Sequence, residues 1–428
     1  TGASNTAVGR DSLRVNTTGA NNTAMGKDAL KANTTGENNV AIGDGAGKSN
    51  TTGGRNIAIG RDAYDASDTE NDNIAIGHHA MTTNTAGGQY NIAIGNYAGD
   101  ALTSADNSVL VGYNAGTAIN TGGSNTAIGH ESMKATTSGI NSTAVGRLAL
   151  QANTTGQENV AVGMQSLQAN TTGNQNTAVG NYALFTNTTA TGNTAVGERA
   201  LRLNTTGASN VAVGRYALTA NTTAAGNTGV GFQALAYNTT GASNTAVGKD
   251  ALYTNVTGAN NTAIGKDSLK VNLGSSNTAV GLNSLLANTT AANNTVVGKD
   301  AGRAITTGGN NVVIGMEAAY AMTTGADCVI IGYGSSATHT GTVHDIVAIG
   351  SRAMQSNTTG VDIVAVGKLA LGANTTGVNS TAVGFEALLS NTTADNNIGI
   401  GFRALKGNET GTRNIAIGSN ANDQTTDE

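Results

Sequence analysis

The chain has 428 residues, of which 60 are glycine and none is proline or tryptophan. Charged residues make up only 11%, against about 25% in an ordinary soluble domain, and the net charge is -5. This composition argues against a basic nucleic-acid-binding surface, and the single Cys328 excludes a disulfide framework and a cysteine-based zinc site. No apolar run is long enough to span a bilayer.

The first repeats establish a period of 17 residues. The motif N-T-A-V-G ends at Gly9, and its glycine recurs at Gly26, Gly43, Gly60 and Gly77. The motif asparagines of the same repeats, counted as position one, are Asn5, Asn22, Asn39, Asn56 and Asn73. We expect these asparagines and glycines to form structural ladders, with each asparagine bonding the turn backbone or the neighbouring coil.

The repeat continues through the rest of the chain, to Gly418. Three intervals differ by one residue, and all three changes fall after position nine, which predicts a loop that points outward. The whole chain, 1–428, is therefore predicted to be one continuous repeat array. It shows no capping sequence at either end, which suggests a segment of a longer fibre.

Within each repeat the pattern is that of a short strand and a turn. Positions two and four are β-branched or aliphatic, position three is mostly Ala, position nine is usually Leu, and positions twelve to fifteen usually read N-T-T-G. Alternation of this kind predicts a strand, and N-T-T-G is typical of turns. We predict an all-β parallel β-solenoid, or β-roll, of about 25 coils stacked at about 4.8 Å, giving a rod on the order of 120 Å long.

Apolar bulk moves between two positions of the repeat. Position nine is small at Gly99, Gly116, Gly302 and Ala319, and in the same repeats position twelve is Leu102, Ile119, Ile305 or Met322 in place of Asn. Such an exchange predicts that both positions face one close-packed core. Gly47 with Asn50 does not follow this rule.

Both faces of the strand are apolar or small, with Val and Ile on one side and Ala on the other. A 17-residue coil can enclose one face only, so the other is expected to meet a partner chain, with the small Ala and Gly columns permitting close approach. A monomeric solenoid is the alternative.

The motifs N-V-A-I-G at Asn39–Gly43, N-I-A-I-G at Asn56–Gly60 and N-V-A-V-G at Asn159–Gly163 resemble the head repeats of trimeric autotransporter adhesins. The longer unit, as in Asn176–Thr189, is similar to repeats of phage and bacterial tail-fibre-like proteins. The first resemblance implies a homotrimeric left-handed β-roll on a bacterial surface. The 17-residue repeat and the N-T-T-G loop depart from the adhesin heads.

Two kinds of candidate site follow from the repeats. N-T-T is a glycosylation sequon, and its asparagines are Asn16, Asn33, Asn50, Asn153, Asn170 and others. The alternative is that N-T-T-G is only a turn. His339 and His344 lie in a lengthened repeat and are the candidates for a metal on a trimer axis; the alternative is exposed loop histidines.

Enzyme chemistry has little support in the sequence, because nucleophile-elbow, zinc-protease and Walker motifs are absent. A carboxylate pair for glycan hydrolysis is the alternative, but no coil carries an unusual cluster of Asp and Glu. We expect an extracellular adhesive filament shaft on a cell surface, without a cofactor, that binds itself and an unknown receptor or glycan. The alternatives are a phage tail fibre shaft, on the virion tail, and a glycan-binding solenoid.

Overall fold

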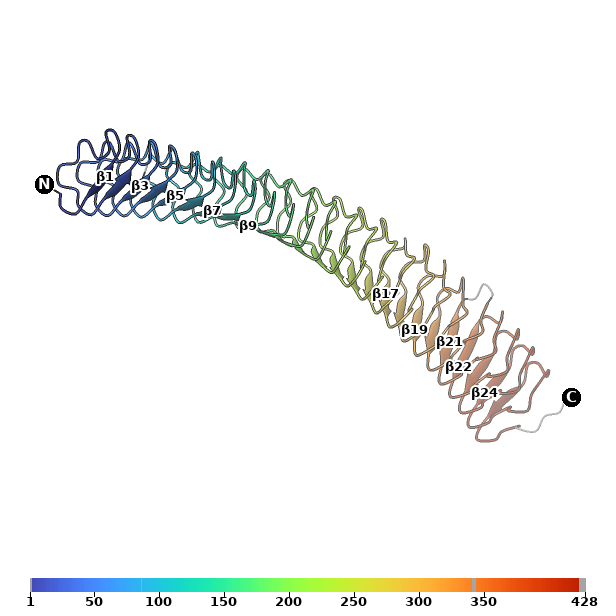
Figure 1. Ribbon diagram of the computed structural model, residues 1–428. Helices are drawn as coiled ribbons and strands as arrows, with labels where there is room; N and C mark the ends of the chain where they lie inside the picture. The colour runs from blue at the N-terminus through green and yellow to red at the C-terminus, as the bar shows by residue number, and fades with distance from the viewer. Residues whose placement is uncertain (1, 86, 341–343, 423–428) are drawn as a thin grey trace. The chain divides into compact units, whose positions relative to one another are not determined.

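A computed structural model describes residues 2–85, 87–340 and 344–422, and these residues form an all-β parallel β-solenoid with 25 strands. This confirms the predicted fold class. The chain divides into two compact units, Thr1–Ala212 and Val213–Glu428, each of which is a stack of coils (Figure 1). One three- or four-residue strand belongs to each coil.

Unit 1 contains the strands β1 (Thr6–Val8), β2 (Thr23–Met25), β3 (Val40–Ile42), β4 (Ile57–Ile59), β5 (Ile74–Ile76), β6 (Ile92–Ile94), β7 (Val109–Val111), β8 (Thr126–Ile128), β9 (Thr143–Val145), β10 (Val160–Val162), β11 (Thr177–Val179) and β12 (Thr194–Val196). The strand β13 (Val211–Val213) lies at the boundary.

Unit 2 contains the strands β14 (Thr228–Val230), β15 (Thr245–Val247), β16 (Thr262–Ile264), β17 (Thr278–Val280), β18 (Thr295–Val297), β19 (Val312–Ile314), β20 (Val329–Ile331), β21 (Ile346–Ile349), β22 (Ile363–Val366), β23 (Thr381–Val383), β24 (Ile398–Ile400) and β25 (Ile415–Ile417).

Neighbouring strands within each unit pair in parallel at equivalent positions of the repeat. Val160 of β10 lies beside Thr177 of β11, and Ala161 lies beside Ala178. The register survives the irregular repeats, because Ile74 pairs with Ile92 although 18 residues separate them. The additional residue is absorbed outside the strands. The predicted outward loop remains a prediction, because residue 86 of this interval lies outside the described residues.

The strand turns its small side chain inward. Ala178, at position three of its coil, is fully buried, whereas Thr177 and Val179 on either side are only half-buried. The expectation that small Ala columns lie open for close approach of a partner is therefore wrong. A narrow coil has room for a methyl group on the strand face, and the larger aliphatic side chains point outward.

The rest of the core comes from the segment after the strand. Position eight is buried as Ala or Ser, and position nine is buried as Leu150, Leu167 or Leu184 in successive coils. In the coils with Gly99 and Gly116 the buried bulk is Leu102 and Ile119, as the exchange of volume predicts.

The structure also accounts for Gly47. The space beside it is filled from the neighbouring coils, because Leu30 lies 3.2 Å from the place of an added Cβ, and the next coil carries the buried Tyr64 in place of Leu. Tyr64 is accompanied by the small Ser67 at position twelve. Volume is thus balanced between coils as well as within one.

Tight winding requires left-handed backbone at fixed places. The glycines Gly9, Gly26, Gly43, Gly60 and Gly77 have φ between 126° and 140°, a region that favours glycine. Positions seven, nine and seventeen have φ near +55°, as in Gln165, Leu167 and Gln175. A left-handed leucine costs about 1 to 2 kcal/mol, which burial of its side chain offsets.

Candidate functional site

The asparagines at position one form a ladder that connects successive coils. The backbone N–H of Asn193 donates to Asn176 Oδ1 at 3.0 Å, and Asn176 Nδ2 donates to the carbonyl of Ala190, at position fifteen of its own coil, at 2.8 Å. The predicted ladder residues follow the same scheme, in which the next motif N–H donates to the side-chain oxygen of Asn5, Asn22, Asn39, Asn56 or Asn73. Each amide therefore bonds both its own turn and the adjacent coil.

The asparagines at position twelve form a second ladder. Asn187 Nδ2 donates to Asn170 Oδ1 at 2.9 Å and to the carbonyl of Ala190 at 3.2 Å, so both ladders converge on one turn carbonyl. These are the sequon asparagines. Asn33, Asn50, Asn153 and Asn170 are buried, and Asn16 is half-buried. The Nδ2 atom that would carry a glycan is therefore enclosed and hydrogen-bonded in the folded coil.

Where position one is not asparagine, the ladder changes its chemistry. Ser108, Ser142 and Ser380 place a hydroxyl there, and each hydroxyl oxygen accepts the next motif N–H at 3.2 to 3.3 Å. The serine itself, and not the Asn or Asp before it, takes over the acceptor role. The preceding residue instead occupies a left-handed conformation, as at Asn107 (φ 58°), which Asn and Asp tolerate well.

The coils of β20, β21 and β22 carry apolar residues in this ladder. Cys328, Ile346 and Ile363 are fully buried, and burial raises the pKa of the Cys328 thiol to about 11. Ile346 pairs with Ile363 within the sheet, so β21 and β22 are each four residues long. An apolar contact and one more paired strand residue replace the amide bridge.

The two histidines proposed for a metal have different surroundings. His339 takes the place of a position-twelve asparagine, is fully buried, and its Nδ1 lies 3.0 Å from Ser336 Oγ. Burial lowers the pKa of His339 to about 4. His344 is exposed beside Asp345 and Asp362, and one ligand atom from each of these three residues lies within 4.8 Å of the others. His339 is not part of that group.

The outward face of the strands is an apolar surface within each unit. In unit 1 it includes Met25, Ile42, Ile94 and Ile128, and in unit 2 it includes Val247, Ile264, Ile314 and Ile400, all of them exposed. These side chains stand at position four of coils that are stacked in register, so they form aliphatic columns. Sequence periodicity indicated a second apolar face, and the structure identifies which side chains form it.

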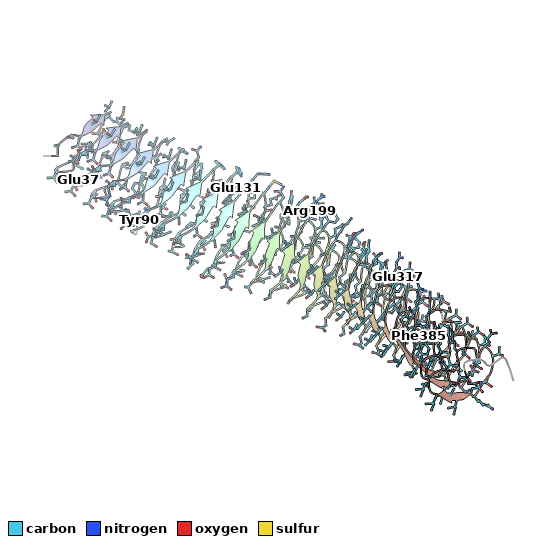
Figure 2. All side chains as sticks on the ribbon, turned by 90° about the horizontal axis from the view of Figure 1, so that it is seen from below. Glu37, Tyr90, Glu131, Arg199, Glu317 and Phe385 are labelled. Carbon is cyan, nitrogen blue, oxygen red and sulfur yellow. The ribbon has the colours of Figure 1, made fainter. Side chains whose placement is uncertain are left out.

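Charged and aromatic side chains gather on the turn after the strand, at positions six, seven and ten. Most of the ion pairs between neighbouring residues at positions six and seven are loose, as in Lys27 and Asp28 at 3.7 Å. Closer contacts join positions seven and ten, as in Asp28 and Lys31 at 3.0 Å, and the Lys31 hydrogen bond lowers the pKa of Asp28. Figure 2 shows side chains of this kind along the outside of the coils.

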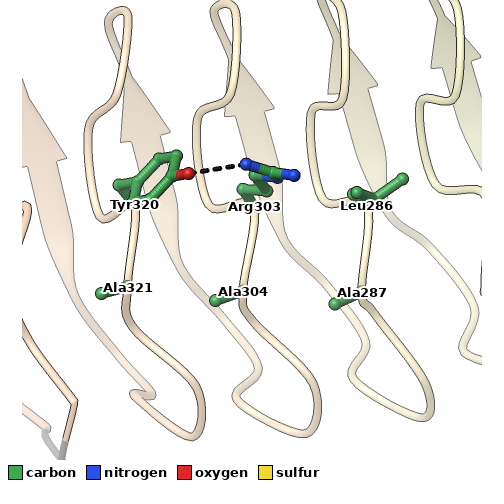
Figure 3. A pocket seen from close by; sticks show the side chains of 6 residues that line it. All are labelled: Leu286, Ala287, Arg303, Ala304, Tyr320 and Ala321. Carbon is green, nitrogen blue, oxygen red and sulfur yellow. Dashed lines mark hydrogen bonds between the residues drawn. The ribbon is translucent and has the colours of Figure 1, made fainter.

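A shallow groove lies in unit 2 beside position eleven. Its floor is Ala287, Ala304 and Ala321, and its rim is Leu286, Arg303 and Tyr320 (Figure 3). Arg303 Nη1 donates to Tyr320 Oη at 2.6 Å. These six residues include no carboxylate pair and no nucleophile beside a base, so the groove offers no evident catalytic chemistry.

No protein-family model and no curated protein matches this chain. Among the described residues there is no helix long and apolar enough to cross a membrane.

Proposed function

We propose that this chain is the shaft of an extracellular adhesive filament and that it assembles as a homotrimer. The observation that carries the proposal is the exposed aliphatic face of the strands. Contiguous apolar surface of this kind marks interaction sites in soluble proteins, and here it runs along consecutive coils of a stiff stack. The resemblance of the motifs to trimeric adhesin heads supplies the threefold assembly and the cell-surface setting.

The internal construction supports a mechanical role. In the regular repeats two asparagine ladders and a parallel sheet connect one coil to the next, so an axial load is shared among many hydrogen bonds. The core is filled by small side chains and leucine, and each coil contacts mainly its neighbours. Such a design projects a binding surface away from its attachment point without requiring a catalytic cavity.

Sedimentation equilibrium of the full chain in native buffer tests the assembly. We expect a mass three times that of the 42.4 kDa chain. A variant carrying Val247→Lys, Ile264→Lys and Val280→Lys places three charges on the outward strand face and is expected to sediment as a monomer.

The matched control places the same three charges at position fourteen, on the turns away from the strand, as Thr240→Lys, Thr257→Lys and Thr290→Lys, where the threonines are exposed. This control is expected to keep the trimer mass. A monomeric native chain would overturn the homotrimer. Equal dissociation of both variants would show that the strand face is not the interface.

A further inference from the structure

A stripe of aromatic rings crosses four successive coils of unit 1. It consists of His78, His79, Tyr97, Tyr113 and His130, which occupy positions six and seven after β5, β6, β7 and β8. The rings of His79 and Tyr97 are parallel within 4° at 5.6 Å, those of Tyr97 and Tyr113 are edge-to-face at 6.2 Å, and those of Tyr113 and His130 are stacked at 5.4 Å. We call this set the aromatic stripe.

The stripe replaces a charged surface at the same positions. Earlier coils of unit 1 carry pairs such as Lys27 with Asp28 and Arg61 with Asp62. Solvated ion pairs contribute little to stability, so their replacement by aromatic rings is not required by the fold. A run of rings along four successive coils forms a contiguous apolar patch, and such patches mark interaction sites.

The stripe is accessible and retains free polar groups. Tyr113 is 47% exposed, His130 is exposed, and Tyr97 is half-buried. Within the described part of the chain, no group hydrogen bonds to the phenol oxygen of Tyr97 or Tyr113. The stripe therefore combines ring surface with hydroxyl and imidazole groups that can donate or accept.

Carboxylates stand at both ends of the stripe. Asp62 lies 3.9 Å from His79 Nε2. Glu131 adjoins His130 and accepts a hydrogen bond from Lys134 Nζ at 2.8 Å, which holds the pKa of Glu131 below its usual range. Each carboxylate is paired with a cation, Asp62 with Arg61 at 3.1 Å and Glu131 with Lys134, so the ends of the stripe offer hydrogen-bond acceptors without a net charge that would attract a charged ligand.

We propose that the aromatic stripe binds an uncharged, extended oligosaccharide. Pyranose rings present C–H bonds that pack on aromatic rings and hydroxyls that bond to phenol, imidazole and carboxylate groups. Coils stacked at about 4.8 Å repeat at nearly the length of one sugar unit in an extended chain, so successive sugars meet successive rings. The inference rests on the proposed adhesive role, to which it gives a ligand class and a site.

Isothermal titration of the full chain with cellohexaose, mannohexaose and a hexamer of galacturonic acid tests the site. The variant carries Tyr97→Asn and Tyr113→Asn. Both changes place a residue that already stands at the same position of a neighbouring coil, as Asn114 at position seven and Asn96 at position six. The backbone of Tyr97 has φ 61°, which asparagine tolerates, so the coil is expected to fold.

Tyr90→Asn is the matched control. Tyr90 is 58% exposed in the same unit but stands at position seventeen, and Figure 2 places it on the opposite edge of the coils from Glu131. We expect a neutral hexamer to bind the native chain and the control equally, and to bind the double variant roughly tenfold more weakly or not at all.

The proposal is overturned if neither neutral hexamer binds, if the charged hexamer binds more tightly, or if the double variant binds as the native chain does. Sedimentation of the same samples separates this result from the filament proposal. A trimer that does not bind sugar would contradict the oligosaccharide site and leave the filament proposal standing. A monomer that binds sugar would contradict the trimeric filament and leave the oligosaccharide site standing.

Discussion

The coils of β10 to β12 and those of β20 to β22 contact their neighbours at positions one and twelve through different side chains. In the first region both asparagine ladders are unbroken, through Asn176 and Asn193 at position one and Asn170 and Asn187 at position twelve. In the second region Ile346 and Ile363 replace the first ladder. His339 takes the place of an asparagine in the second, where Asn357 Nδ2 lies 3.4 Å from its ring nitrogens. At position one the solenoid therefore accepts either an asparagine ladder or a short run of buried apolar residues, so asparagine itself is not required in every coil.

The largest expected effect comes from breaking a ladder in the regular region. Asn176→Leu leaves the buried N–H of Asn193 without its acceptor and adds an apolar side chain against a polar neighbour. We expect the free energy of local opening to fall by about 4 kcal/mol. Hydrogen exchange of the peptide that spans β11 and β12, followed by mass spectrometry, measures this loss.

Asn176→Ser is the control for that change. Serine occupies position one elsewhere, and its hydroxyl accepts the next N–H, as Ser142 does from Asn159 at 3.2 Å. We expect a loss of only about 1 kcal/mol. Equal losses for Leu and Ser would show that the acceptor at this corner is unimportant.

The second effect is a pH dependence confined to the irregular region. His339 has a pKa of about 4 in the fold, below the ordinary value of 6.5, because burial disfavours its charged form. The unfolded chain therefore binds a proton between these values and the folded chain does not, so stability falls as the pH drops from 6.5 to 4. The loss is at most about 3 kcal/mol.

Urea unfolding at pH 7 and pH 4.5, compared between the native chain and His339→Asn, isolates this contribution. The variant restores the residue found in regular coils and should lack this part of the acid sensitivity. Acid sensitivity that is unchanged in His339→Asn would show that carboxylates alone account for it.

The third effect tests whether the apolar pair at position one, Ile346 and Ile363, can be replaced by a pair of asparagines. Ile346→Asn alone sets a polar amide against Ile363, and we expect a loss of about 2 kcal/mol. The double variant Ile346→Asn and Ile363→Asn rebuilds two steps of a ladder. It should cost less than the sum of the single changes by at least about 1 kcal/mol. Hydrogen exchange across β21 and β22 measures the cycle, and strict additivity would show that Ile346 and Ile363 do not act as a pair.

The smallest effect concerns two aspartates, Asp345 and Asp362, that directly precede Ile346 and Ile363 in the sequence. Asp345 and Asp362 stand at position seventeen of adjacent coils, whereas the acid at Asp72 is bonded to Arg55 of the adjacent coil at 2.6 Å. Asp345→Asn removes one of two neighbouring like charges and keeps a residue suited to φ 58°. We expect stabilisation below about 0.5 kcal/mol, visible as a small rise in melting temperature at low salt and absent at 1 M salt.

Local pattern alone determined the fold class, the period and the candidate core. The recurrence of Gly9, Gly26 and their successors, the alternation around each Ala, and the exchange between Gly99 and Leu102 all predicted stacked coils with position nine and position twelve inside. These features can be recognised in the sequence because each coil packs and hydrogen-bonds against a similar coil. The same residue types are therefore needed at the same positions of every repeat.

Only the tertiary structure decided which way the strand faces and what the asparagines do. Alternation shows that Ala178 and Val179 point to opposite sides, but the width of the coil determines that alanine is the buried one. The sequons could be read as glycan sites until burial placed Asn153 and Asn170 in a ladder. The aromatic stripe escaped notice because its rings alternate between two positions of the repeat, and only the winding of the coils brings them into contact.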